Sequence, residues 1–183
     1  MTVKEVVNNV IDFLQLDEAR TALENNDIDN DELSLLVRCS NLVVSEIANE
    51  YYPLKDNAKV EANGNGEIFY HDFPRPPYDV YKVVNVNGIS VPFIRYHDKI
   101  VVTRVGEYDI YYSYAPDTLA LDDELPFPPK IDARTVAYGT ACEYCLISGM
   151  TEEATIWDRR YKNALTSATF PSKELRIKKR RWI

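Results

Sequence analysis

The feature that most limits how this chain can fold is a double change in the spacing of its apolar residues. Apolar residues recur at helical spacing in the first fifty residues, at every second position across 54–116, and at helical spacing again from 131. These spacings are typical of helices and of strands, respectively. This order of helical, strand and helical regions predicts an α+β protein. Because neither helical half carries enough apolar surface for its own core, we expect one helical bundle built from both halves, with an antiparallel β module inserted between them.

The N-terminal helical region is expected to span residues 1–53. A capping-box pattern starts at Thr2 and marks the beginning of the first helix. A longer helix follows a polar stretch, with Asp29 as its expected N-cap and Glu32 three residues later. Pro53 ends this region, because proline cannot continue a helix.

The β module, with an acidic and proline-rich linker at its end, is expected over residues 54–126. Five of its segments are rich in β-branched and aromatic residues: Glu67–Tyr70, Tyr78–Val86, Ile89–Phe93, Lys99–Thr103 and Tyr108–Tyr114. Asn87-Gly88 predicts a two-residue hairpin turn, since both residues tolerate the positive φ that such a turn needs. Short strands at this spacing indicate an antiparallel sandwich or a barrel-like module.

The closing helical region is expected over residues 127–172. One helix runs from about Ile131 to Gly149, which is its expected stop, and Thr151 is the expected N-cap of a second helix. Its end is expected before Pro171.

The charges of the chain divide sharply between a body and a short arm. The chain has 29 acidic and 21 basic side chains, a net charge of −8. Residues 173–183 contain six basic side chains and one acidic one, so this arm carries +5 and residues 1–172 carry −13. Apolar residues interleave with these charges, as in a docking segment with anchors and steering charge. We expect the following residues to contact a partner: Arg176, Ile177, Lys178, Lys179, Arg180, Arg181, Trp182 and Ile183.

Motifs for metal, redox or catalytic chemistry are incomplete in this chain. Cys142 and Cys145 form a CxxC pattern, but they lie well inside a predicted helix and on its apolar face, which favours buried packing. Asp27, Asp29 and Asp31 resemble the start of a calcium loop, but the required glycine and final glutamate are missing. Helix capping explains these acids better. We therefore expect no enzyme, no cofactor and no metal site.

Two observations bear on localisation. No apolar run approaches the roughly 18–20 residues that span a bilayer, and the first residues show no apolar signal core. The three cysteines are an odd number and too few for a disulfide scaffold, which suits assembly in a reducing compartment.

The last third of the chain carries a resemblance. Tyr144-Cys-Leu-Ile-Ser-Gly-Met-Thr-Glu-Glu-Ala154 joins two predicted helices, and Trp157-Asp-Arg-Arg-Tyr-Lys-Asn-Ala-Leu165 leads to the basic arm. This pattern, and the order of helices, β module, helix pair and arm, resembles the head–tail adaptor (connector) proteins of tailed bacteriophages, including the podovirus tubular tail proteins of the A type.

The resemblance implies a structural virion protein at the head–tail junction, made in the host cytoplasm. Such adaptors form a ring, usually dodecameric, beneath the portal protein, and their C-terminal arm docks on portal subunits. The other implied partner is a downstream tail protein of the nozzle or tube, for which the ring is a platform. DNA would pass through the channel without sequence-specific binding, and no membrane is involved.

Two alternatives remain open. The tyrosine-rich strands could form a glycan- or surface-binding module on a helical stalk, because aromatic rings stack on sugars. Alternation assigns Ile110, Tyr112 and Tyr114 to one face of a strand and Tyr111 to the other, so at least half of these rings could be core. A basic-tailed nucleic-acid-binding protein is the other alternative, although an acidic body opposes phosphate.

Overall fold

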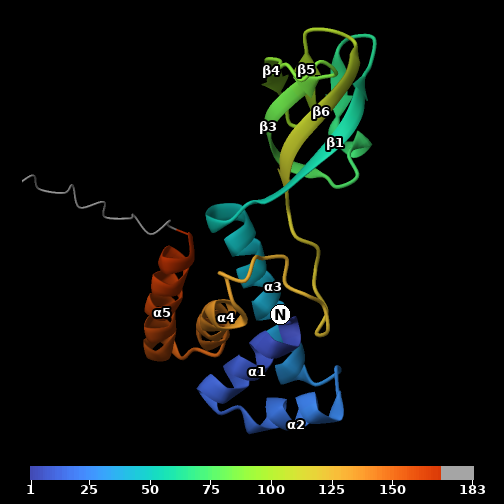
Figure 1. Ribbon diagram of the computed structural model, residues 1–183. Helices are drawn as coiled ribbons and strands as arrows, with labels where there is room; N and C mark the ends of the chain where they lie inside the picture. The colour runs from blue at the N-terminus through green and yellow to red at the C-terminus, as the bar shows by residue number, and fades with distance from the viewer. Residues whose placement is uncertain (170–183) are drawn as a thin grey trace, which may run out of the picture. The chain divides into compact units, whose positions relative to one another are not determined.

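The computed structural model describes residues 1–169, and they form two compact units. The helical unit consists of Met1–Val43 and of residues 120–169, and the β unit is Val44–Leu119. The chain leaves the helical unit near the end of its third helix and returns after Leu119, so the β unit is an insertion. The structure confirms an α+β protein in which helices flank a sheet module in the sequence (Figure 1).

The helical unit is built from helices at both ends of the described chain. They are α1 (Val3–Leu14), α2 (Asp17–Asn25), α3 (Asp31–Glu46), α4 (Ala133–Ile147) and α5 (Thr151–Thr169). The apolar faces of α1 and α4 are buried, and α5 adds the buried side chains of Tyr161 and Leu165. Gly139 lies in α4 where an added Cβ would meet a side-chain carbon of Val43 at 2.7 Å and one of Tyr161 at 2.9 Å. The helices approach closely there because this residue has no side chain.

Helix ends agree with the sequence in two places and differ in one. The capping box at Thr2 is confirmed, and Gly149 has the positive φ of 78° that follows α4. The expected N-cap of α3 is wrong: the side chain of Asn30, and not that of Asp29, accepts the backbone N–H of Leu33 at 3.0 Å. Asn30 directly precedes the first helical residue, so its amide oxygen reaches the third helical N–H, as an N-cap must.

Glu32 joins three helices instead of closing a capping box. One carboxylate oxygen accepts the backbone N–H of Ala19 in α2 at 3.0 Å, and the other accepts the hydroxyl of Tyr144 in α4 at 2.7 Å. Tyr144 is 112 residues from Glu32 in the sequence, so their contact helps hold the two halves of the helical unit together.

The start of α1 pairs with the segment that precedes α4. The N–H groups of Val3 and Lys4 donate to the carbonyls of Asp123 and Leu121 at 3.0 and 2.7 Å, and the N–H of Leu125 donates to the carbonyl of Met1 at 3.0 Å. This short antiparallel pairing joins the two chain segments that make up the helical unit.

The β unit contains six strands in two antiparallel sheets. They are β1 (Leu54–Ala62), β2 (Glu67–Phe69), β3 (Pro77–Asn85), β4 (Phe93–Arg95), β5 (Lys99–Val102) and β6 (Gly106–Tyr114). One sheet has the order β1-β6-β3, visible as three neighbouring arrows in Figure 1, and the other has the order β2-β5-β4. A π-helical turn at Ile47–Tyr51 precedes β1.

Both sheets contribute to one core, as expected for a sandwich. Ile110 and Tyr112 of β6 are fully buried, together with Ile68 of β2 and Ile100 of β5. Tyr114 packs against this core, so the face assignment from strand alternation is confirmed for the three residues on that side.

Two strands differ from expectation. β1 is absent from the expected segments because its inward positions include two alanines, Ala58 and Ala62, which give a weak apolar signal. The expected strand Ile89–Phe93 is wrong: this stretch makes an isolated bridge between Ser90 and Val84, and the strand β4 begins only at its last residue. The predicted turn is present, with Gly88 at φ 78°.

Candidate docking site

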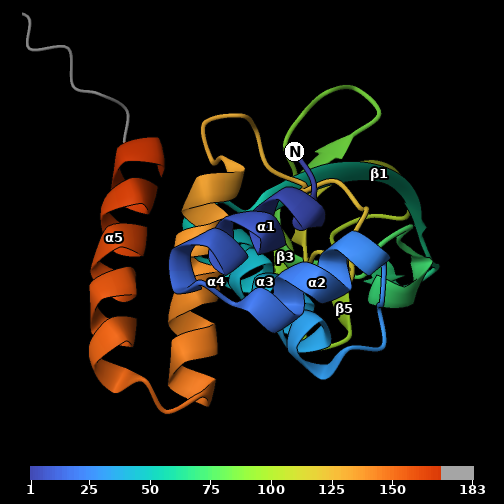
Figure 2. The same cartoon turned by 90° about the horizontal axis from the view of Figure 1, so that it is seen from below.

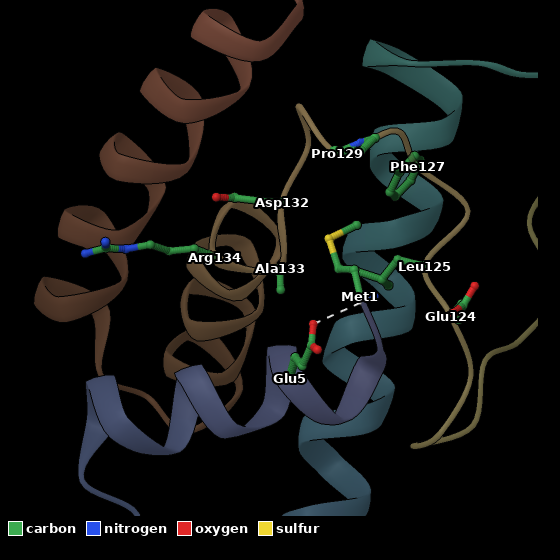
Figure 3. A pocket seen from close by; sticks show the side chains of 9 residues that line it. All are labelled: Met1, Glu5, Glu124, Leu125, Phe127, Pro129, Asp132, Ala133 and Arg134. Carbon is green, nitrogen blue, oxygen red and sulfur yellow. Dashed lines mark ion pairs between the residues drawn. The ribbon is translucent and has the colours of Figure 1, made fainter.

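The expected docking residues of the arm, Arg176 to Ile183, lie outside the described residues, as does the rest of the arm from Lys173. Within residues 1–169, the helical unit offers an open hollow of ≈ 490 Å³ beside the start of α4. Its lining residues are Met1, Glu5, Glu124, Leu125, Phe127, Pro129, Asp132, Ala133 and Arg134 (Figure 3).

Two stretches that are distant in the sequence build this hollow, the start of the chain and residues 124–134. The first turn of α1 supplies Glu5, the segment before α4 supplies Leu125 and Phe127, and the first turn of α4 supplies Ala133. The pairing of residues 1–4 with 121–125 fixes the first two segments side by side. Figure 3 shows the side chain of Met1 between Leu125 and Ala133, so the middle of the hollow is apolar.

Three acidic side chains belong to the lining. Glu5 points toward Met1 from α1, whereas the side chain of Asp132, at the start of α4, points toward α5, and Glu124 lies on the outer side of the linker (Figure 3). All three are exposed. Glu5 lies 3.9 Å from the terminal ammonium of Met1, and Arg134 is the basic side chain of the lining. The lining therefore has three carboxylates, one guanidinium and one ammonium.

The first three backbone donors of α1, and that of Thr135 in α4, are already used. A free helix N-terminus attracts anions through its unpaired N–H groups. In α1 the N–H of Glu5 donates to the hydroxyl of Thr2, and the two preceding N–H groups donate to the linker carbonyls. In α4 one oxygen of Asp132 accepts both the N–H and the hydroxyl of Thr135, at 2.8 and 2.7 Å. The hollow is thus suited to cations and apolar groups more than to anions.

A second hollow of ≈ 380 Å³ lies at the other end of α5. It is lined by Phe13, Leu14, Leu16, Met150, Glu153, Ile156, Trp157 and Arg160. Phe13, Tyr138 and Trp157 stack on one another, with ring centres 5.1–5.9 Å apart. Ile147 and Ile156, close to the turn between α4 and α5, are about half exposed at 55% and 48%. The sequence pattern does not predict this apolar area, because it assigns such residues to a buried face.

The cysteines are packing residues. Cys39, Cys142 and Cys145 are free and buried, and burial raises the pKa of the Cys39 and Cys142 thiols to about 11. A thiol with a raised pKa is a poor nucleophile and a poor ligand at neutral pH. Within residues 1–169, no three His, Cys, Asp or Glu side chains come together in a group that could hold a metal ion.

Some tyrosines of the β unit face its core and others face solvent. Tyr108 and Tyr112 are buried in the core, whereas Tyr78 and Tyr96 are exposed at 65% and 50%. Tyr111 is on the outer face of its sheet, with the ammonium of Lys82 5.3 Å from its ring centre.

Neither a scan against models of protein families nor a search of curated proteins gives a match to this chain. None of the helices within residues 1–169 has both the length and the apolar character needed to cross a membrane.

Proposed function

We propose that the protein is a non-enzymatic structural protein of a virion, a ring-forming head–tail adaptor that docks on the portal protein through Arg176 to Ile183. The ring is dodecameric, as the resemblance to such adaptors implies, and offers a platform to the next tail protein. It lies at the head–tail junction after assembly from protein made in the host cytoplasm. DNA passes through its channel without sequence-specific binding.

The observation that carries this proposal is the closing helix pair together with the basic arm. α4 and α5 are joined at the Ser148-Gly149-Met150 turn, the segment that resembles the adaptor proteins, and the basic arm comes after α5 in the sequence. The β unit is an insertion within the helical unit, which is the order that the resemblance implies.

The apolar area near the turn between α4 and α5 supports self-assembly. Leu146, Ile147 and Ile156 are about half exposed, and the apolar hollow lined by Trp157 lies beside α5. Contiguous exposed apolar surface on a soluble protein marks an interaction site. In a ring, each copy would cover this area with its neighbour.

The test is portal binding by the full chain and by a chain that ends at residue 172. The probe is the portal protein encoded in the same genome, purified as a ring. The full chain is expected to bind it and to form rings visible by electron microscopy, and the shortened chain is expected to lose binding while it keeps its circular dichroism spectrum.

Two variants distinguish what the charges of the arm contribute to portal binding from what its aromatic side chain contributes. Lys178→Ala/Lys179→Ala should slow association and lower its salt sensitivity, because exposed charges mainly steer encounter. Trp182→Ala should speed dissociation, because a buried aromatic side chain contributes most to the lifetime of a complex. Unchanged portal binding by the chain that ends at residue 172 would refute docking through the arm.

The alternative is a glycan- or surface-binding module, which the exposed rings of Tyr78 and Tyr96 favour. A glycan array with the full chain would detect it. A saccharide response that Tyr78→Ala/Tyr96→Ala abolishes would support this alternative, and the absence of any response would remove it.

A further inference from the structure

We propose that the hollow beside the start of α4 binds the basic arm of the same chain, with Lys178 to Arg181 between the carboxylates and Trp182 on the apolar surface. The arm thereby has a resting site on its own helical unit while no partner is bound. This inference goes beyond portal docking, and it concerns the free protein.

Charge is the first argument for this occupant. The lining holds three carboxylates against Arg134 and the terminal ammonium, whereas the arm carries six basic side chains and one acidic one. The described part of the helical unit has 17 acidic and 8 basic side chains, so the wider field also attracts a cationic segment. The two hydrogen bonds that Thr135 donates to Asp132 both end on its Oδ1 atom, so capping α4 does not occupy the whole carboxylate.

Apolar chemistry is the second argument. The middle of the hollow is lined by Met1, Leu125 and Ala133, and Figure 3 shows Met1 between the other two. Its volume of ≈ 490 Å³ falls within the range of about 300–1,000 Å³ that holds small ligands in proteins. A tryptophan preceded by two arginines suits an apolar surface with carboxylates nearby, since the ring can desolvate while the charges pair beside it.

The position at which the arm is tethered is the third argument. α4 and α5 lie side by side and run in opposite directions, so the last turn of α5 and the first turn of α4 are at the same end (Figure 2). Three of the residues that line the hollow lie at that end: Asp132, Ala133 and Arg134. Residues 170–183 could extend by about 46–50 Å, and a short tether gives an effective concentration in the millimolar range. Even a weak contact is populated under these conditions.

The hollow does not suit a negatively charged ligand. Two helices begin beside it, but N–H groups of their first turns already point to the linker carbonyls, to Thr2 and to Asp132. A phosphate or a carboxylate would meet three acidic side chains where these backbone donors are engaged. The basic arm is therefore the better match among charged occupants.

The experiment follows the fluorescence of Trp182 in the full chain without any portal protein. The emission of Trp182→Phe is subtracted from that of the full chain, which removes the contribution of Trp157. We expect the difference spectrum to be shifted to shorter wavelength than that of a synthetic peptide of residues 173–183. Zero-length carbodiimide cross-linking of the monomer should also join Lys178 or Lys179 to a carboxylate of the hollow.

Two triple variants test whether the carboxylates of the hollow are what holds Trp182. Glu5→Gln/Glu124→Gln/Asp132→Asn removes three charges but keeps side chains that can cap α1 and α4. It should lose the blue shift of Trp182. Glu24→Gln/Asp27→Asn/Asp29→Asn removes the same charge from exposed positions near the end of α2 and should retain the shift.

Three outcomes would overturn the proposal. They are a Trp182 spectrum equal to that of the peptide, an equal loss of the shift in both triple variants, and a shift that appears only as the protein oligomerises in sedimentation experiments. The last outcome would mean that the arm binds a neighbouring copy. Because no portal is present, each result is independent of the portal-binding test.

Discussion

The helical unit and the β unit differ in how sequence-distant segments are held together. In the β unit, backbone ladders join the strands, and β1 and β6 pair along nine residues each. In the helical unit, only one short backbone pairing, of residues 1–4 with 121–125, joins the halves, and individual side chains add to it. Glu32 binds Tyr144, and the hydroxyl of Thr140 lies 3.4 Å from that of Ser40. We infer that the helical unit depends on a few specific groups, and the β unit on its aromatic core.

The two units also carry different chemical reporters. All three cysteines lie in the helical unit, and ten of the thirteen tyrosines lie in the β unit. Thiol labelling therefore reports opening of the helical unit alone, while the near-ultraviolet signal of tyrosine mainly reports the β unit. Unfolding of the two units can be followed separately in one sample.

The largest effect is expected from Tyr112→Ala in the β core. Tyr112 is fully buried and meets the edge of Phe73 with ring centres 5.0 Å apart. Loss of a buried aromatic side chain costs about 3–5 kcal/mol, so the tyrosine signal should be lost at much lower urea. Tyr81→Ala, on the exposed side of the same sheet, is the control and should cost less than about 1 kcal/mol. An equal shift of thiol labelling in Tyr112→Ala would show that the two units unfold as one.

A smaller effect is expected from Glu32→Ala in the helical unit. This change removes the acceptor of the Tyr144 hydroxyl and of the Ala19 N–H, and leaving such donors unpaired costs about 1–3 kcal/mol. Cys39 and Cys145 should then be labelled faster by an aromatic disulfide reagent, with the tyrosine signal unchanged. Glu24→Ala, an exposed acid of α2, should leave the labelling rate as it is.

The smallest effect on stability is expected only at alkaline pH. Burial, and after it the hydrogen bond to Glu32, raises the pKa of Tyr144 from 10.0 to about 12. Between pH 10 and 12 the unfolded chain has therefore lost a proton that the native state still holds, so the stability of the helical unit falls as the pH rises. Tyr144→Phe should make this fall less steep in urea titrations. An identical slope in the variant would show that Tyr144 is not responsible.

The sequence predicts the pattern of elements well because each rests on local chemistry. The capping box at Thr2, the turn at Gly88 and the inward position of Tyr112 depend on neighbouring residues alone. The cap of α3 is harder to predict because two adjacent side chains, Asp29 and Asn30, can both cap, and only the backbone geometry distinguishes them.

The hollow could not be predicted in this way. It depends on the pairing of residues 1–4 with 121–125, and no periodicity or motif links segments more than a hundred residues apart. Composition does indicate an acidic body and a basic arm, but it cannot place Glu5, Glu124 and Asp132 around one surface. Portal docking through Arg176 to Ile183 stays a prediction, since those residues lie outside the described part of the chain.

The pairing of residues 1–4 with 121–125 has a consequence for how such a chain can change over evolutionary time. Because the helical unit closes on itself around the insertion, strands can be lengthened, shortened or exchanged between Val44 and Leu119 without rebuilding the helices. Selection can then act on the two units at different rates. Relatives of this protein should therefore retain the paired segments and vary most in the β unit.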